Sequence, residues 1–391
     1  MLVQREGRLE VTEESFDQTG IDVQATPAEP VSPEAFDFEA YAGYEASLLE
    51  RCRAFWKAES GVLVWRRMRI AEVFSWGCRD MKASLEWQLG GLQKSMEFKA
   101  DVPNFIVPWY GIGTVAGAFS ADYIWKEEQA PTICPMFSSV KEALQYNSVP
   151  VSQARIGRHT LEMIDYFLDK TGGRVPMSLT DTQSPLNIAC NIVQMSSFFI
   201  EMLDNPQAVN TLLNRLAELL VEFTQEQIKH IGDALVWPGH GYCSCRCFEG
   251  LGMSDDNALM ISGRQYLDLV ASAVELAGEP FGGSAFHCCG NWTDKIVAVK
   301  KITGLRMVDG AFSAATDPSP NPPEPFGEGF ANTGIVVNAR IVGGLKTIVE
   351  SVRRLWKPGM KLIVVTYCQS PEEQAKAYDH IYEICGQAKP A

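Results

Sequence analysis

After residue 101 the chain alternates between short apolar segments and longer helical patterns. The apolar segments, each with the length of a buried strand, cover residues 104–110, 175–180, 234–238, 283–287, 305–309, 334–338 and 361–367. Residues 205–231 illustrate the helices between them, because Asn205 is a good capping residue, Pro206 suits a first helical position, and leucines recur every three or four residues. This alternation predicts a parallel sheet covered by helices.

Seven or so such units over residues 101–391 favour an α/β fold of the (β/α)8 TIM barrel type over a two-domain, doubly wound protein. Neither a GxGxxG nor a GxxxxGK[ST] motif follows any predicted strand, which removes the usual nucleotide-binding reason for an open sheet. The segment 317–329 is too rich in proline for a helix or a central strand and is expected to be a long loop, either a plain connector, a lid or a docking surface for a partner.

Two further regions precede the predicted barrel. Residues 36–100 show aromatic and aliphatic residues at helical spacing and are expected to form an N-terminal helical layer. Within it, residues 64–69 suggest a helix with a solvated basic face. Residues 1–35 are polar, acidic and interrupted by three prolines, which predicts a flexible or loosely draped arm.

The negative charge of the chain is concentrated in its first 50 residues. Lys and Arg total 34 against 48 Asp and Glu, a net charge of −14, of which residues 1–50 carry −10. With no basic stripe, binding to nucleic acid or to an anionic membrane is not expected. No apolar run has the length of a membrane span, the N-terminus does not resemble a signal peptide, and eleven cysteines suggest a reducing, cytoplasmic location.

The most informative chemical motif ends the strand predicted at 283–287. His287 and Cys289 are two residues apart, so in an extended backbone they project to the same side, and Cys368 ends the last predicted strand. Imidazole and thiolate ligands at the carboxyl ends of barrel strands, with a fourth position free, would make a catalytic zinc site. The alternative is a core histidine with buried cysteines.

Other candidates follow the same rule of strand ends. Asp181 and Asp309 could act as catalytic acid or base, although a loop-capping role explains an aspartate at such a position equally well. Trp109 and Tyr110 could line a substrate pocket or simply belong to the core. Asp255, with its neighbour Asp256, could bind substrate or be a plain loop carboxylate. The alternating Cys243, Cys245 and Cys247 could form a second metal site, but no partner spacing accompanies them.

The HxCG motif at residues 287–290, with a further cysteine about 80 residues later, resembles the cobalamin-dependent methyltransferases of the uroporphyrinogen decarboxylase superfamily. These include coenzyme M methyltransferases and the enzymes of anaerobes that demethylate methyl ethers and halomethanes. The likeness extends over roughly residues 100–388 and includes Asp204-Asn205-Pro206 before a long helix. By that resemblance, His287, Cys289 and Cys368 would bind zinc, and a separate corrinoid protein would carry cobalamin, since no DxHxxG loop is present.

The sequence differs from that of true uroporphyrinogen decarboxylase, because residues 64–69 lack the Gln-Ala-Gly-Arg run that binds the propionate groups of that enzyme's substrate. The departure favours methyl transfer over decarboxylation. A zinc ion with two thiolates and one neutral imidazole carries no net charge, which favours activation of a thiol acceptor. The alternatives are the donor-side reaction from an aryl methyl ether, methylamine or halomethane, a metal-free uroporphyrinogen decarboxylase, and a non-enzymatic zinc-binding protein.

Overall fold

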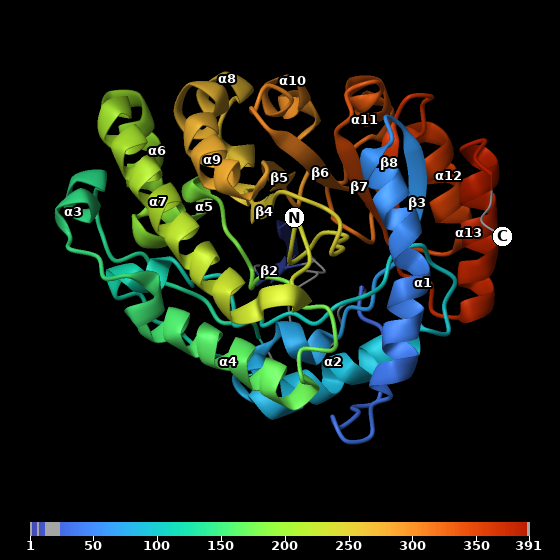
Figure 1. The fold of residues 1–391 in the computed structure, drawn as a ribbon. Helices are drawn as coiled ribbons and strands as arrows, with labels where there is room; N and C mark the ends of the chain where they lie inside the picture. Colours follow the sequence, from blue (N-terminus) through green and yellow to red (C-terminus); the bar gives the residue numbers. More distant parts are fainter. Residues whose placement is uncertain (1, 6–7, 12–23, 128, 389–391) are drawn as a thin grey trace.

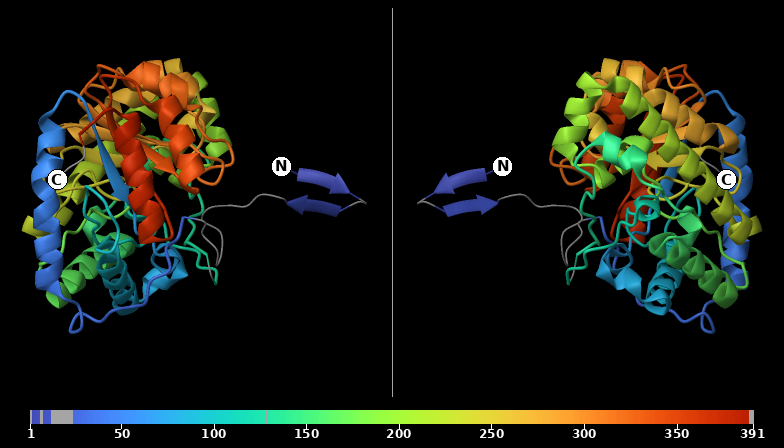
Figure 2. Two further views of the ribbon diagram at one scale, coloured as in Figure 1. Left: turned by 90° about the vertical axis from the view of Figure 1, so that its right-hand side faces the viewer. Right: turned by 90° about the vertical axis from the view of Figure 1, so that its left-hand side faces the viewer.

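A six-stranded parallel sheet organises the fold. The computed structural model describes residues 2–5, 8–11, 24–127 and 129–388. The strands lie in the order β3 (Gly61–Arg66), β8 (Lys361–Thr366), β7 (Val336–Ile341), β6 (Leu305–Ala311), β5 (Ser284–His287) and β4 (Leu251–Ser254). A separate antiparallel hairpin, β1 (Leu2–Arg5) and β2 (Arg8–Val11), stands away from the body (Figure 2). The predicted strands at 283–287, 305–309, 334–338 and 361–367 therefore correspond to β5 to β8.

Three further extended segments continue the sheet beyond its two edges. Single parallel bridges join Ile106 to Met177 and Met177 to Leu235, which places the predicted strands at 104–110, 175–180 and 234–238 side by side. At one edge the backbone N–H of Asp101 donates to the carbonyl oxygen of Val64 in β3. At the other, Gln183 bridges to Ser254 in β4. Through these contacts the strands and extended segments follow one another in a barrel-like arrangement.

Helices cover the outside of this arrangement, as an alternating α/β sequence requires. Figure 1 shows α9, α12, α13 and α1 outside the arc of strands, with α4 and α2 on the opposite side of the molecule. The helices are α1 (Phe38–Lys57), α2 (Met81–Ser95), α3 (Val140–Gln145), α4 (Arg155–Thr171), α5 (Pro185–Ile192), α6 (Met195–Asp204), α7 (Pro206–Ile231), α8 (Gly263–Gln265), α9 (Ala271–Gly278), α10 (Ile296–Val299), α11 (Pro323–Phe330), α12 (Leu345–Leu355) and α13 (Pro371–Ile384). Asn205 caps α7 as predicted, accepting a hydrogen bond from the Ala208 backbone. In the described part of the chain, no helix is both long and apolar enough to cross a membrane.

Alternate residues of the strands belong to two different apolar clusters. Ile363 and Val365 of β8, together with Tyr367 just after it, pack in the interior cluster that also contains Trp65 of β3. Val364 packs in the larger cluster shared with the outer helices. This two-residue period is the pleat of the strand, and it decides which side chains reach the interior.

The region expected to be a purely helical layer differs from the prediction. Residues 61–66 form β3, which pairs with β8 in parallel register, and the expected solvated helix over 64–69 is therefore wrong. Arg66, Arg67 and Arg69 are all buried. The β-branched and aromatic residues of GVLVWR favour a strand, and all six residues are buried because both faces of β3 are covered. The helical spacing of its apolar residues is therefore a coincidence.

The arm and the proline-rich segment also differ in part. Part of the predicted arm lies outside the described residues, but residues 24–35 are docked on the protein: Thr26 accepts a hydrogen bond of 2.9 Å from Arg66, and its N–H donates to the Arg69 carbonyl. The segment 317–329 ends in helix α11, so the expectation of no helix there is wrong. Pro323 is its first residue, where a missing N–H costs no helical hydrogen bond.

Candidate functional site

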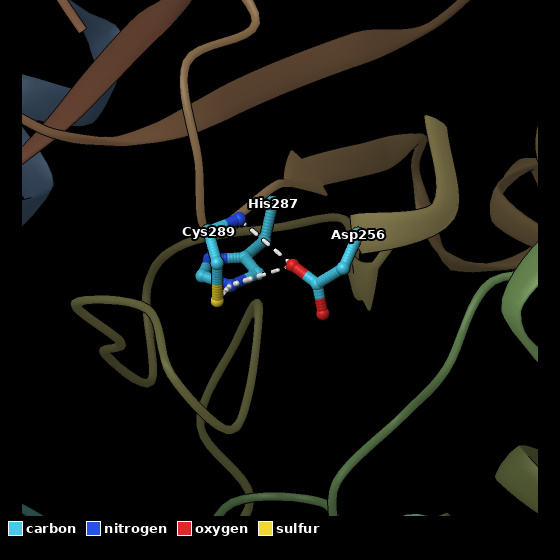
Figure 3. A group of neighbouring side chains, drawn as sticks. All are labelled: Asp256, His287 and Cys289. Carbon is cyan, nitrogen blue, oxygen red and sulfur yellow. Dashed lines mark hydrogen bonds and ion pairs between the residues drawn. The ribbon is translucent and has the colours of Figure 1, made fainter. Parts of the chain in front are cut away.

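Three potential metal ligands meet where β4 and β5 end. His287 is the last residue of β5, Cys289 follows it, and Asp256 follows β4. The Nε2 atom of His287 lies 3.2 Å from Sγ of Cys289 and 3.7 Å from Oδ1 of Asp256. The Cys289 backbone N–H also donates to Asp256 Oδ1 over 2.7 Å (Figure 3). We refer to Asp256, His287 and Cys289 as the ligand trio.

A buried carboxylate orients the imidazole of the trio. His287 Nδ1 lies 2.6 Å from Oδ2 of Asp309, which is fully buried in β6. Asp309 also accepts hydrogen bonds from Asn338 and, over 2.9 Å, from Arg340, both in β7. Burial alone would raise the pKa of Asp309, but the charge of Arg340 and the hydrogen bonds from His287 and Asn338 outweigh burial and lower it. The carboxylate is therefore ionised and accepts the Nδ1 proton.

The trio fits a divalent metal ion. With the Nδ1 proton directed at Asp309, Nε2 of His287 presents its lone pair toward Cys289 and Asp256, which is the usual carboxylate–histidine–metal arrangement. One imidazole, one thiolate and one carboxylate are ligands that Zn²⁺ accepts, and three protein ligands leave a coordination position for substrate. Among the described residues this is the one group of three with such geometry.

Cys368 does not join the trio. It follows β8 on the same side as Val364, in the cluster shared with the outer helices, whereas Tyr367 takes the interior position. Burial raises the pKa of its thiol to about 12. The predicted ligand set of His287, Cys289 and Cys368 is thus brought together only in its first two members, because the pleat directs position 368 outward.

Asp255, a predicted substrate-binding residue, is buried and fully engaged. Its two carboxylate oxygens accept hydrogen bonds from Ser184 Oγ at 2.7 Å and from Tyr266 Oη at 2.6 Å. Burial raises its pKa to about 6. These bonds fix the turn from which Asp256 projects, so the structure gives Asp255 a supporting position and its neighbour the place beside His287.

Asp181 forms a second polar centre in the interior. Its Oδ2 atom accepts a hydrogen bond of 3.1 Å from the Trp109 indole and lies 3.3 Å from Nε2 of His240, while Gln183 donates to Oδ1 over 2.8 Å. Burial raises the pKa of Asp181 to about 6, although the bonds from Trp109 and Gln183 oppose the rise. At neutral pH this carboxyl group therefore exchanges a proton readily.

A chain of amide side chains connects Asp181 to the trio. Gln183 accepts from Asn187, and Asn187 in turn accepts from both the backbone and the side chain of Asn257, which follows Asp256. Asp181 and Asp256 are close enough for the charge of Asp256 to raise the pKa of Asp181. The two carboxyl groups thus belong to one site rather than to separate ones.

The remaining candidates lie outside this site. Tyr110 is half-buried and packs on His159, with ring centroids 3.9 Å apart. Cys243 and Cys245 are buried in the interior cluster, and Cys245 Sγ lies 3.3 Å from Cys247 Sγ. These cysteines contact one another and not the trio.

Sequence reasoning did not select His240 or Arg340 as site residues, and it considered Asp256 only together with Asp255 as a possible substrate-binding residue, not as a metal ligand. Asp256 stands at a strand end beside a residue that was selected, and its position after β4 was hidden because that short strand carries little apolar signal. Arg340 alternates with Asn338 along β7, so its interior orientation could be predicted only once the inward face of β7 was known.

Comparison with known proteins finds a family similarity over part of the chain. Residues 68–244 match the model of the uroporphyrinogen decarboxylase (URO-D) family. The resemblance to the uroporphyrinogen decarboxylase superfamily is confirmed. The URO-D match includes Trp109, Asp181 and His240 and ends before the trio. No curated protein sequence matches the chain.

The solved structures contain a similar fold. A methyltransferase from Methanosarcina mazei superposes with a TM-score of 0.60 at 14% sequence identity, over 86% of this chain and 98% of that one. At this identity the likeness establishes a shared α/β fold, which extends over nearly the whole of that protein.

Proposed function

We propose that this protein is a metal-dependent methyltransferase that moves a methyl group between a corrinoid, carried by a separate protein, and a small molecule. The observation that carries the proposal is the ligand trio at the carboxyl end of the sheet, with His287 oriented by Asp309. A bound Zn²⁺ would act as a Lewis acid for the oxygen or sulfur atom that gains or loses the methyl group. The fold shared with a methyltransferase supports the same reaction class.

The chemistry of the trio bears on the direction of transfer. A preference for a thiol acceptor depended on two thiolate ligands, and the structure offers one thiolate, from Cys289, and one carboxylate, from Asp256. A carboxylate oxygen makes the site harder, which suits a substrate that binds through oxygen. We therefore favour the donor-side reaction, in which an O-methyl group passes to cob(I)alamin, and keep the thiol-acceptor reaction as the second candidate.

Asp181 supplies a function that the donor-side reaction needs. Loss of a methyl group from an ether leaves an alkoxide or phenoxide, which must be protonated. A buried carboxyl group with a pKa of about 6, held by Trp109 and Gln183 in the same interior, is a suitable general acid. Asp309 is a positioning residue, since both of its oxygens are engaged by His287, Asn338 and Arg340.

One set of assays tests the proposal. Purified protein is mixed with cob(I)alamin and a panel of methoxyaromatics, or with methylcob(III)alamin and a panel of thiols, and the cobalt spectrum is followed. The donor-side reaction predicts formation of methylcob(III)alamin in the first mixture. An unchanged spectrum in both, together with loss of carboxyl groups from uroporphyrinogen, would contradict methyl transfer and establish the decarboxylase.

A further inference from the structure

We propose that Arg340, Arg67 and Tyr367 form an oxyanion subsite beside the ligand trio, and that the small-molecule substrate therefore carries a carboxylate. This inference concerns the substrate class of the site and rests on the proposed function. The three residues come from β7 and from the positions that follow β3 and β8. They stand at the same carboxyl end of the sheet as His287.

Arg340 has one donor atom that the protein leaves without an acceptor. Its side chain is 7% exposed, its Nε donates to Asp309 over 2.9 Å, and its buried Nη2 has no hydrogen-bond partner in the described part of the chain. A buried, unpaired guanidinium N–H is costly, so an acceptor from a ligand would relieve it. Because Arg340 lies two residues after Asn338, which contacts Asp309 in the interior, its side chain enters the same space.

Arg67 supplies a second positive charge to this part of the interior. Its Nη1 donates to the hydroxyl group of Tyr367 over 3.4 Å, and both residues are buried. Within the described residues no carboxylate forms an ion pair with Arg67. Strand β8 lies between β3 and β7, so Tyr367, which follows β8, lies between Arg67 and Arg340 in strand order. Arg340 is also within electrostatic reach of Tyr367 and of Cys289, a member of the trio.

The charges around these groups leave room for one anion. The carboxylate of Asp309 balances one positive charge, that of Arg340, and leaves the charge of Arg67 unbalanced. Asp317, on the loop after β6, is a further acidic group near Arg340, but it is half-buried and forms no ion pair with Arg340 in the described part of the chain. Two guanidinium groups and a hydroxyl group match the acceptor geometry of a carboxylate, which arginine binds through parallel N–H donors.

Matched ligand pairs that differ only in charge test the subsite. The probes are 4-methoxybenzoate against 4-methoxybenzamide, and 3-mercaptopropionate against 3-mercaptopropanamide, with 4-methoxybenzenesulfonate as a second oxyanion. Binding to the full-length protein is measured by isothermal titration calorimetry. We expect one acid to bind at least about tenfold more tightly than its amide, and sulfonate binding would extend the subsite to oxyanions in general.

Substitutions then assign the preference to the subsite. R67Q should reduce the preference for the acid to less than about twofold. R340K keeps a positive charge next to Asp309 but lacks the paired N–H donors of the guanidinium group, and it should reduce the preference in part. R264Q is the control, because the side chain of Arg264 is 91% exposed, and it should behave as the wild type. Melting curves confirm that each variant is folded.

The proposal is overturned if acids and amides bind equally to the wild type, or if folded R67Q and R340K keep the full preference. These outcomes are separate from those of the cobalt assays. A charge preference without any change in the cobalt spectrum would leave the subsite in place and reject methyl transfer, and the converse would reject the subsite alone.

Discussion

His287 and Asp309 are joined by a hydrogen bond of 2.6 Å between the imidazole Nδ1 and a carboxylate without exposed surface. This bond connects the end of β5 to the interior of β6, and Asp309 is fixed in turn by Asn338 and Arg340 of β7. The orientation of the histidine is therefore set by three adjacent strands rather than by the loop that follows it, which is how a rigid scaffold holds a metal ligand.

Replacing Asp309 by Asn should weaken metal binding without removing a ligand. The amide cannot stabilise the Nδ1–H tautomer in the same way and leaves Arg340 without its counter-charge. In other metal sites, loss of such a supporting carboxylate typically lowers metal affinity by about 10- to 100-fold. Competition with a zinc chelator measures the change. An affinity equal to that of the wild type would remove Asp309 from the metal site.

Metal content distinguishes the trio seen in the structure from the set predicted by sequence. The variants D256A, H287A and C289A should each lose most of the roughly one zinc per chain expected for a three-ligand site. C368S is the matched control, because that thiol lies in the outer cluster, and it should keep its zinc. Elemental analysis of the purified proteins decides. Loss of zinc from C368S, H287A and C289A but not from D256A would restore the set based on resemblance.

Replacing Asp181 by Asn should stabilise the protein above about pH 6. The pKa of Asp181 is raised by burial from 3.8 to about 6, so its stabilising contribution is complete below pH 4 and is lost as the pH rises through 6. A shift of two pKa units corresponds to about 3 kcal/mol, and loss of the contact with His240 offsets part of it. We expect a gain of about 2 kcal/mol in the free energy of unfolding at pH 8 and little at pH 4. A difference that does not vary with pH would contradict the assignment.

The rate of demethylation should depend on the same proton. If Asp181 protonates the leaving oxygen, the rate falls as the pH rises above about 6, because the acid form is lost. The D181N variant should be about 100-fold slower at pH 6 and should lack this descending limb. The rate of methyl transfer to cob(I)alamin over pH 5 to 8 provides the measurement. A descending limb that persists in D181N would assign it to another group.

Two glycine substitutions test how residues 24–35 are attached. A Cβ atom on Gly90 in α2 would lie 1.8 Å from the carbonyl oxygen of Glu29, whereas one on Gly43 in α1 would meet nothing within 4 Å. G43A should therefore raise the free energy of unfolding by about 0.5–1 kcal/mol through helix propensity. G90A should lower it by about 1–3 kcal/mol through overpacking. Chemical denaturation measures both, and a stabilised G90A would show that this segment moves aside freely.

The sequence predicted the apolar framework better than the site. Strands β6 to β8 have six or seven mostly apolar residues, so their pattern identified them, and β5 was found although it has only four residues. His287 and Cys289 came from the two-residue period of an extended chain. Strand β3 was missed because its apolar residues also fit helical spacing, and β4 because Gly252 interrupts its short apolar run. Local pattern cannot choose between such alternatives when tertiary pairing decides them.

The third metal ligand shows a second limit of prediction from sequence. Cys368 was chosen because it ends the last strand, but a strand end offers two faces, and the interior face at β8 belongs to Tyr367. Asp256, by contrast, reaches His287 because the bonds of Asp255 to Ser184 and Tyr266 fix the turn before it. Such dependence on residues distant in sequence is not visible in spacing.

The pairing of β3 with β8 brings residue 61 into register with residue 361. Closing so long a loop is slow compared with forming local contacts, and β8 leaves the ribosome long after β3. Until then both neighbouring edges, that of β3 and that of β7, are unpaired. A nascent chain that stops before residue 361 therefore exposes two unpaired strand edges that can pair with other chains. A truncated chain that lacks β8 should aggregate rather than form a smaller folded protein.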